Sequence, residues 1–297
     1  MIAPLLNITV RVGCHVAYET SMPTPALFVL RPRLDENHFV FAEQLSFGSG
    51  VPSYEFQDFY GNIACRTMLS PGRNDIRHDA LVSVSSLDER QGTGEPFTPV
   101  HEIPTEFLRY ILPSRYCDTD KLLNFAWENF GQINSGHERV QAICDWVHNN
   151  IEYRFGAGRA DSSASEIIGQ RYGVCRDFAH AVIALCRTFN LPARYVTGHL
   201  PDIAHDETTG DFHAYCEVFL GGRWHIYDAR FNTPRIGRIK LAHGLDAVDG
   251  AFATIYGEAR LVHFEVWAYQ VNPGEVSVGD PIDLSKRLDG TLNVRLS

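Results

Sequence analysis

The sequence predicts an α+β fold in which a β-rich N-terminal region precedes a region of helices and antiparallel strands. Between Asn7 and Leu87, apolar residues alternate with polar ones in short runs that Gly, Pro, Asn and Asp separate, as in antiparallel strands. From Asp120 to Asn190, apolar residues recur every three or four positions, as on one face of a helix. Strand-like runs return from Ala193 onward.

These patterns divide the chain of 297 residues into three parts. We expect a β-rich domain over residues 1–100, a mixed helix–strand domain over residues 101–275 and a polar tail over residues 276–297. The stretch Asp88 to Phe107 is rich in Gly, Pro, Thr and Glu, which favours a linker. A chain of this length can fill one large core or two modest ones.

The elements of the mixed region follow from local signals. Ser135-Gly136 is a plausible cap before the second helix, and Asn190-Leu191-Pro192 ends the last one. The predicted helices span residues 120–130, 137–151, 162–173 and 175–190. The predicted later strands span residues 193–200, 212–220, 223–229 and 260–271.

Composition excludes several classes of protein. With 44% hydrophobic and 21% charged residues, the chain is typical of globular proteins and not of disordered ones. A net charge of −10 argues against a nucleic-acid or anionic-membrane partner, since such proteins normally carry a basic patch. The N-terminus lacks the pattern of a secretory signal, and no run approaches the ~20 apolar residues of a membrane helix. We therefore expect a cytoplasmic location.

The seven cysteines are scattered, odd in number and never in C-x-x-C spacing. A disulfide framework or a cysteine-rich zinc site is therefore not expected. The thirteen histidines form no H-E-x-x-H or H-x-E…P-C-x-x-C pattern, so the sequence predicts no metal site and no cofactor. A zinc protein stays open as an alternative that metal analysis would test.

One cysteine differs from the others in its position. In "RYGVCRDFAHAVIALC", Cys175 follows Gly173 closely and opens a run with helical spacing. The unpaired N–H groups and the dipole at a helix N-terminus favour an anion and lower a thiol's pKa. The same N–H groups could stabilise an oxyanion. Cys175 is therefore a candidate nucleophile, although most free cysteines only fill a core.

A hairpin further along supplies a possible base and an orienting acid. Gly221-Gly222 separates two strand-like runs, a strong signal for a two-residue turn that pairs Leu220 with Arg223. In this register His213 and Asp228 become diagonal neighbours on one face. A slip by one residue would move Asp228 to the apolar face. The spacing thus favours a Cys–His–Asp arrangement for nucleophilic catalysis.

The motifs "GVCRDFAH" and "DFHAYCEVFLGGRWHIYDA" resemble the transglutaminase-like superfamily, and in particular its bacterial branch described as cysteine proteases. The β-rich region before Asp88 also resembles the N-terminal domain of many bacterial members. In that family the catalytic Cys, His and Asp stand at positions that match Cys175, His213 and Asp228. Where the family commonly reads D-P-T, this chain has Asp228-Ala229-Arg230, which puts the substrate side of the site in doubt.

The resemblance implies a papain-like core, with the cysteine's helix packed on an antiparallel sheet after a β-sandwich-like domain. It also implies a metal-independent thiol mechanism on a peptide or protein amide substrate. A cysteine protease or amidase is the favoured function. Glutamine cross-linking or deamidation by an acyltransferase, an arylamine acetyltransferase-like or deglycosylating enzyme, and a non-catalytic peptide-binding module stay open.

Overall fold

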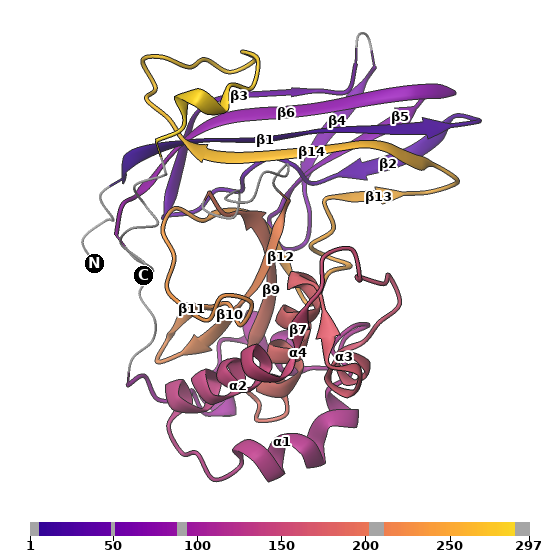
Figure 1. Ribbon diagram of the computed structural model, residues 1–297. Helices are drawn as coiled ribbons and strands as arrows, with labels where there is room; N and C mark the ends of the chain where they lie inside the picture. Colours follow the sequence, from indigo (N-terminus) through magenta and orange to yellow (C-terminus); the bar gives the residue numbers. More distant parts are fainter. Residues whose placement is uncertain (1–5, 49–50, 88–93, 202–210, 289–297) are drawn as a thin grey trace.

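The computed structural model describes residues 6–48, 51–87, 94–201 and 211–288. Two β-sheets form a sandwich at one end of the molecule, the helices lie at the other end, and a third sheet lies between them (Figure 1). This arrangement is the expected α+β fold, with antiparallel sheets in both the N-terminal and the core regions. Within the described ranges, no helix is both long enough and apolar enough to cross a membrane.

The sandwich consists of two four-stranded antiparallel sheets whose inner faces bury a shared apolar core. That core contains Cys14 and Val16 from one sheet and Phe28 and Cys65 from the other. The first sheet has the order β14 (Arg260–Gln270), β1 (Leu6–Thr20), β6 (Gly72–Ser85), β3 (His38–Ser46). The second has the order β13 (Ala253–Ile255), β2 (Thr24–Phe28), β5 (Ile63–Leu69), β4 (Ser53–Gln57).

The third sheet carries the candidate site together with the helices. Its strand order is β11 (Arg223–Tyr227), β10 (His213–Leu220), β9 (Ala193–His199), β12 (Ile239–Gly244). The α-helices are α1 (Leu123–Phe130), α2 (Gly136–Asn150), α3 (Ala164–Gln170) and α4 (Cys175–Arg187). The short elements are β7 (Glu152–Tyr153), β8 (Tyr172–Gly173), η1 (Val100–Glu102), η2 (Thr105–Ile111), η3 (Thr119–Leu122) and η4 (Leu284–Lys286).

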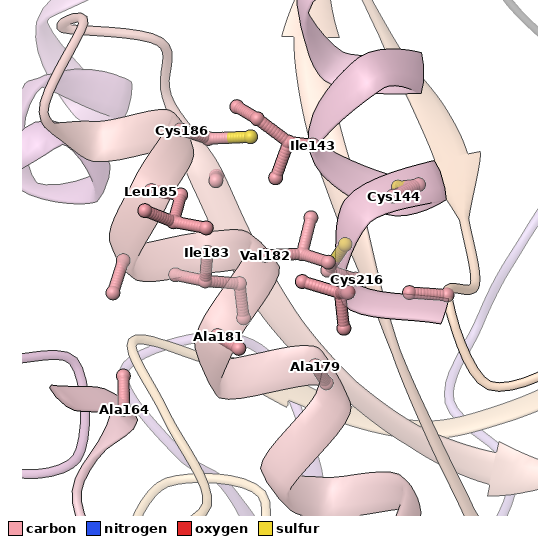
Figure 2. Close-up of a cluster of buried hydrophobic side chains, with 14 of the residues drawn as sticks. Ile143, Cys144, Ala164, Ala179, Ala181, Val182, Ile183, Leu185, Cys186 and Cys216 are labelled. Carbon is pink, nitrogen blue, oxygen red and sulfur yellow. The ribbon is translucent and has the colours of Figure 1, made fainter. Parts of the chain in front are cut away.

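Helix α4 lies at the centre of the larger core, and nearly all of its residues are buried. Its side chains pack against those of α2 and against the inner face of β10, as Figure 2 shows for Val182, Cys186, Ile143 and Cys216. The register in which Ala214, Cys216, Val218 and Leu220 face this core is the one that the sequence pattern favoured. Burial of this apolar surface fixes α4 firmly on the sheet.

The last long strand returns to the beginning of the chain. Strand β14 pairs antiparallel with β1, and β13 pairs with β2, so residues from within the predicted 101–275 domain complete both sheets of the sandwich (Figure 1). Pairing between β1 and β14 satisfies backbone groups that would otherwise be exposed at a sheet edge. Of the predicted tail, residues 276–288 are described and the remainder lies outside the described residues.

Candidate active site

Cys175 is the first residue of α4, and the chain before it is shaped for this position. The backbone N–H of Val174 donates to Asp177 Oδ2 (3.0 Å), which ties the start of the helix to its first turn. A Cβ atom at Gly173 would lie 2.8 Å from Cβ of Asp177, so glycine is needed for this close approach. The Cys175 backbone N–H is among the first of the helix, where no intrahelical acceptor is available.

Cys175 differs from the other cysteines of the chain because the residue is partly exposed, although its sulfur is largely shielded from water. All seven cysteines are free; six are buried and Cys175 is partly exposed. The backbone N–H of Ala214 faces the Cys175 sulfur and favours its thiolate form. Because Ala214 directly follows His213, this contact brings the sulfur to the start of β10.

The electrostatic setting of the thiol departs from the sequence-based expectation. Loss of hydration on burial is the largest effect and raises the pKa of Cys175 to about 12. The Ala214 N–H lowers it, whereas the carboxylates of Asp211 and Asp228 raise it further. The raised pKa runs opposite to the lowering expected from the helix N-terminus alone, because desolvation is the largest effect on this thiol.

The hairpin register that the sequence predicts is confirmed. Leu220 pairs with Arg223, and the ladder continues to the pair Cys216 and Tyr227. Gly221 and Gly222 have φ values of 55° and 86°, the left-handed region that a tight two-residue turn requires.

Asp228 follows directly after β11, and its Oδ2 lies 2.7 Å from Nε2 of His213. The two side chains are buried, so water competes little for this hydrogen bond. The ring of His213 also lies 5.4 Å, centroid to centroid, from the ring of Phe231.

A guanidinium group, which the sequence analysis did not single out, binds the same carboxylate. Arg238 donates from Nη2 to Asp228 Oδ2 at 2.7 Å and is itself buried. Burial alone would raise the pKa of Asp228, but His213 and Arg238 together hold it well below its usual range. Asp228 therefore stays ionised and can orient the imidazole of His213. No local motif marked Arg238, because it lies in a stretch between strands.

Tyr153 is a further residue at the thiol that the sequence analysis did not single out. It ends β7. Burial is the largest effect that raises the pKa of its phenol, and the electrostatic interaction with Cys175 adds to the rise. The guanidinium of Arg230 lies 3.7 Å from the centroid of the Tyr153 ring and partly offsets this rise. Tyr153 thus remains a neutral phenol within electrostatic range of Cys175. Arg230 occupies the position where the sequence departs from the family's D-P-T pattern.

Because the raised pKa keeps the side chain of Cys175 as a neutral thiol near pH 7, its alkylation should depend on pH. We expect the rate of Cys175 modification by iodoacetamide to rise about tenfold per pH unit from pH 7 to 9, because the thiolate fraction limits the rate and the pKa is raised. Mass spectrometry of Cys175 peptides would follow the reaction, with the buried cysteines as internal controls. A rate that is already constant above pH 6 would instead indicate a preformed thiolate.

Comparison with known proteins gives consistent matches. The profile of the Transglutaminase-like superfamily matches residues 127–229. A crystal structure from Cytophaga hutchinsonii, provisionally named a cysteine protease, is 30% identical with a TM-score of 0.81, covering 94% of this chain and 96% of the other. An uncharacterized protein of Mycobacterium leprae is 23% identical over 73% of this chain and 81% of its own length. The kyphoscoliosis peptidase of Homo sapiens is 26% identical over 41% of this chain, but over only 18% of its own length.

Proposed function

This chain belongs to the transglutaminase-like superfamily, and from that premise we propose that it is a thiol-dependent hydrolase of peptide or amide bonds. In this proposal Cys175 is the nucleophile, His213 the general base and acid, and Asp228 the group that orients His213. The proposal needs no metal or cofactor. The similarity to proteins named as a cysteine protease and a peptidase supports hydrolysis as the reaction.

One observation carries the proposal. The buried His213–Asp228 pair, with 2.7 Å between Nε2 and Oδ2, adjoins the Ala214 N–H that faces the Cys175 sulfur. In this proposal the nucleophile from α4, the base from β10 and the acid that follows β11 act together at the start of β10. An arrangement of this kind is typical of acyl-transfer enzymes.

The proposed reaction follows from the protonation states. His213 removes the proton from the Cys175 thiol as the sulfur attacks the amide carbon, which forms the C–S bond and an oxyanion. The imidazolium then gives its proton to the leaving amine as the C–N bond breaks. Water, activated by His213, hydrolyses the thioester and restores the thiol. The Cys175 backbone N–H and the Tyr153 hydroxyl are our proposed oxyanion donors.

The test is to trap the acyl-enzyme. Wild type and Cys175→Ala are incubated with glutamine peptides, plain peptides and small amides, and adducts and products are followed by mass spectrometry. We expect adducts and hydrolysis products with wild type only. Incorporation of an added amine in preference to water would replace the hydrolase by an acyltransferase. Peptide binding without turnover, equal in both proteins, would replace it by a binding module.

Replacing Tyr153 by Phe tests its role as an oxyanion donor. We expect kcat to fall about 10²-fold with KM nearly unchanged, because the hydroxyl acts on the oxyanion and not on the bound substrate. Tyr172→Phe is the matched control, since Tyr172 lies on the neighbouring strand β8 with Arg154 over its ring. A similar kcat for Tyr153→Phe and wild type would remove Tyr153 from the mechanism.

A further inference from the structure

A cluster of two histidines and one glutamate lies on the outer face of the sandwich, on the paired strands β1 and β14. His15 of β1 stands directly opposite Glu265 of β14, and His263 lies two residues before Glu265. The neighbours Cys14 and Val16 point into the sandwich core, so His15 points away from it. One ligand atom from each of His15, His263 and Glu265 lies within 4.8 Å of the others.

One distance within this cluster fits a metal site better than a hydrogen bond. His263 Nε2 lies 3.6 Å from Glu265 Oε2, which is too long for a hydrogen bond. Two ligand atoms each about 2.1 Å from a tetrahedral zinc ion lie roughly 3.4 Å apart. This Nε2 atom is shielded from solvent and has no hydrogen-bond partner among the described residues. A buried ring nitrogen without a partner is unusual, and a cation would satisfy it.

The surroundings hold His15 in position. Asp75 of β6 lies 2.8 Å from Nε2 of His15, and Arg73 binds the same carboxylate through two nitrogens. Carboxylates that orient metal-bound histidines in this way are a regular feature of metal centres. The guanidinium carbon of Arg77, the residue opposite His15 on β6, lies 5.5 Å from the centroid of the Trp267 ring.

We propose that His15, His263 and Glu265 form a binding site for a divalent cation of the zinc class. Two imidazoles and one carboxylate are ligands that Zn²⁺ prefers, and three protein ligands leave a fourth position for water. The side chains are 25%, 38% and 35% exposed respectively, so an ion can reach them from solvent. The bound ion joins β14 to β1 and therefore stabilises the closure of the sandwich by the C-terminal strand. The site is separate from the proposed catalytic residues.

The test uses tag-free protein in a Cys175→Ala background, which removes the Cys175 thiol as a competing ligand. Titration with Zn²⁺, and with Co²⁺ followed by its visible absorption, should show one bound ion per chain and a rise in Tm. His263→Gln should bind at least about 100-fold more weakly, and Glu265→Gln, which keeps the side-chain shape, should also bind more weakly. His101→Gln, at an exposed histidine outside the cluster, should bind as the background protein does.

The outcomes separate the possibilities clearly. Weaker binding in both cluster variants, with a metal-free Tm close to that of the background protein, supports the site. No binding by the Cys175→Ala protein at micromolar free metal overturns the proposal. Equal affinity in the background protein, His263→Gln and Glu265→Gln overturns it as well, because the ion would then be held elsewhere.

Discussion

Cys175→Ala is expected to lose at least about 10⁴-fold in kcat/KM on any substrate that wild type hydrolyses, because no other group can form the thioester. The variant should fold normally, since Cys175 lies at the edge of the core and removal of one sulfur atom leaves only a small cavity. Activity is measured as product release from the peptide and amide panel, and folding as the free energy of unfolding. Residual turnover within tenfold of wild type would exclude Cys175 as the nucleophile.

The matched control is Cys65→Ala, which removes a thiol buried in the sandwich core. This change is expected to lower stability by about 1 kcal/mol or somewhat more, as small truncations in a core do, while kcat/KM stays near the wild-type value. Cys175→Ala should lose activity and keep its stability, whereas Cys65→Ala should lose stability and keep its activity. This contrast separates an effect on catalysis from an effect on folding. Equal losses of activity in both would indicate that stability, and not the nucleophile, limits turnover.

Asp228→Asn is expected to have the second largest effect, because one carboxylate serves both His213 and Arg238. The imidazole loses the charge that holds its tautomer, so we expect kcat to fall about 10³- to 10⁴-fold. The buried ion pair between Asp228 and Arg238 is broken, so we expect a loss of about 3–5 kcal/mol in the free energy of unfolding. Steady-state kinetics and urea unfolding at pH 7 measure the two effects.

The pH dependence of this stability difference has a definite sign. The folded-state pKa of Asp228 is depressed, so its contribution is present above the unfolded pKa of about 3.9 and is lost as the pH falls below it. The difference between wild type and Asp228→Asn should therefore be constant from pH 7 to 5 and shrink towards pH 2. A difference independent of pH down to pH 2 would contradict the role of the charge.

Glu217→Gln provides the control for Asp228→Asn. Glu217 is also buried and lies on β10, where it forms ion pairs with Arg194 and Lys240. The variant should lose stability in the same way but keep kcat, because Glu217 contacts neither His213 nor Cys175 in the described structure. A comparable fall in kcat would mean that any damage to β10 inactivates the protein, and the catalytic role of Asp228 would then need other support.

Much of the site follows from local sequence. The two glycines at 221 and 222 set the turn, the alternation along β10 sets the face, and together they bring His213 to Asp228. The helix start at Cys175 follows from the apolar spacing after Gly173. These signals act over a few residues, where backbone conformation and side-chain period decide the structure. They also predict most of the strands and helices, but not β12 or β13, for which the sequence analysis gave no strand.

Other features arise only from contacts between residues far apart in the chain. Pairing of β14 with β1 gathers His15, His263 and Glu265, although no short window of sequence contains a metal motif. Tertiary packing likewise brings Arg238 to Asp228 and Tyr153 to Cys175. The raised pKa of the thiol depends on burial by several elements at once.

The sequence by itself determined the local elements, the hairpin register and the identity of the three candidate catalytic residues. The tertiary structure alone decided which charges surround those residues and which strands close the sandwich. The reason is physical: hydrogen bonding within turns and helices is short in range. By contrast, the desolvation of a side chain and the pairing of distant strands depend on how the whole chain packs.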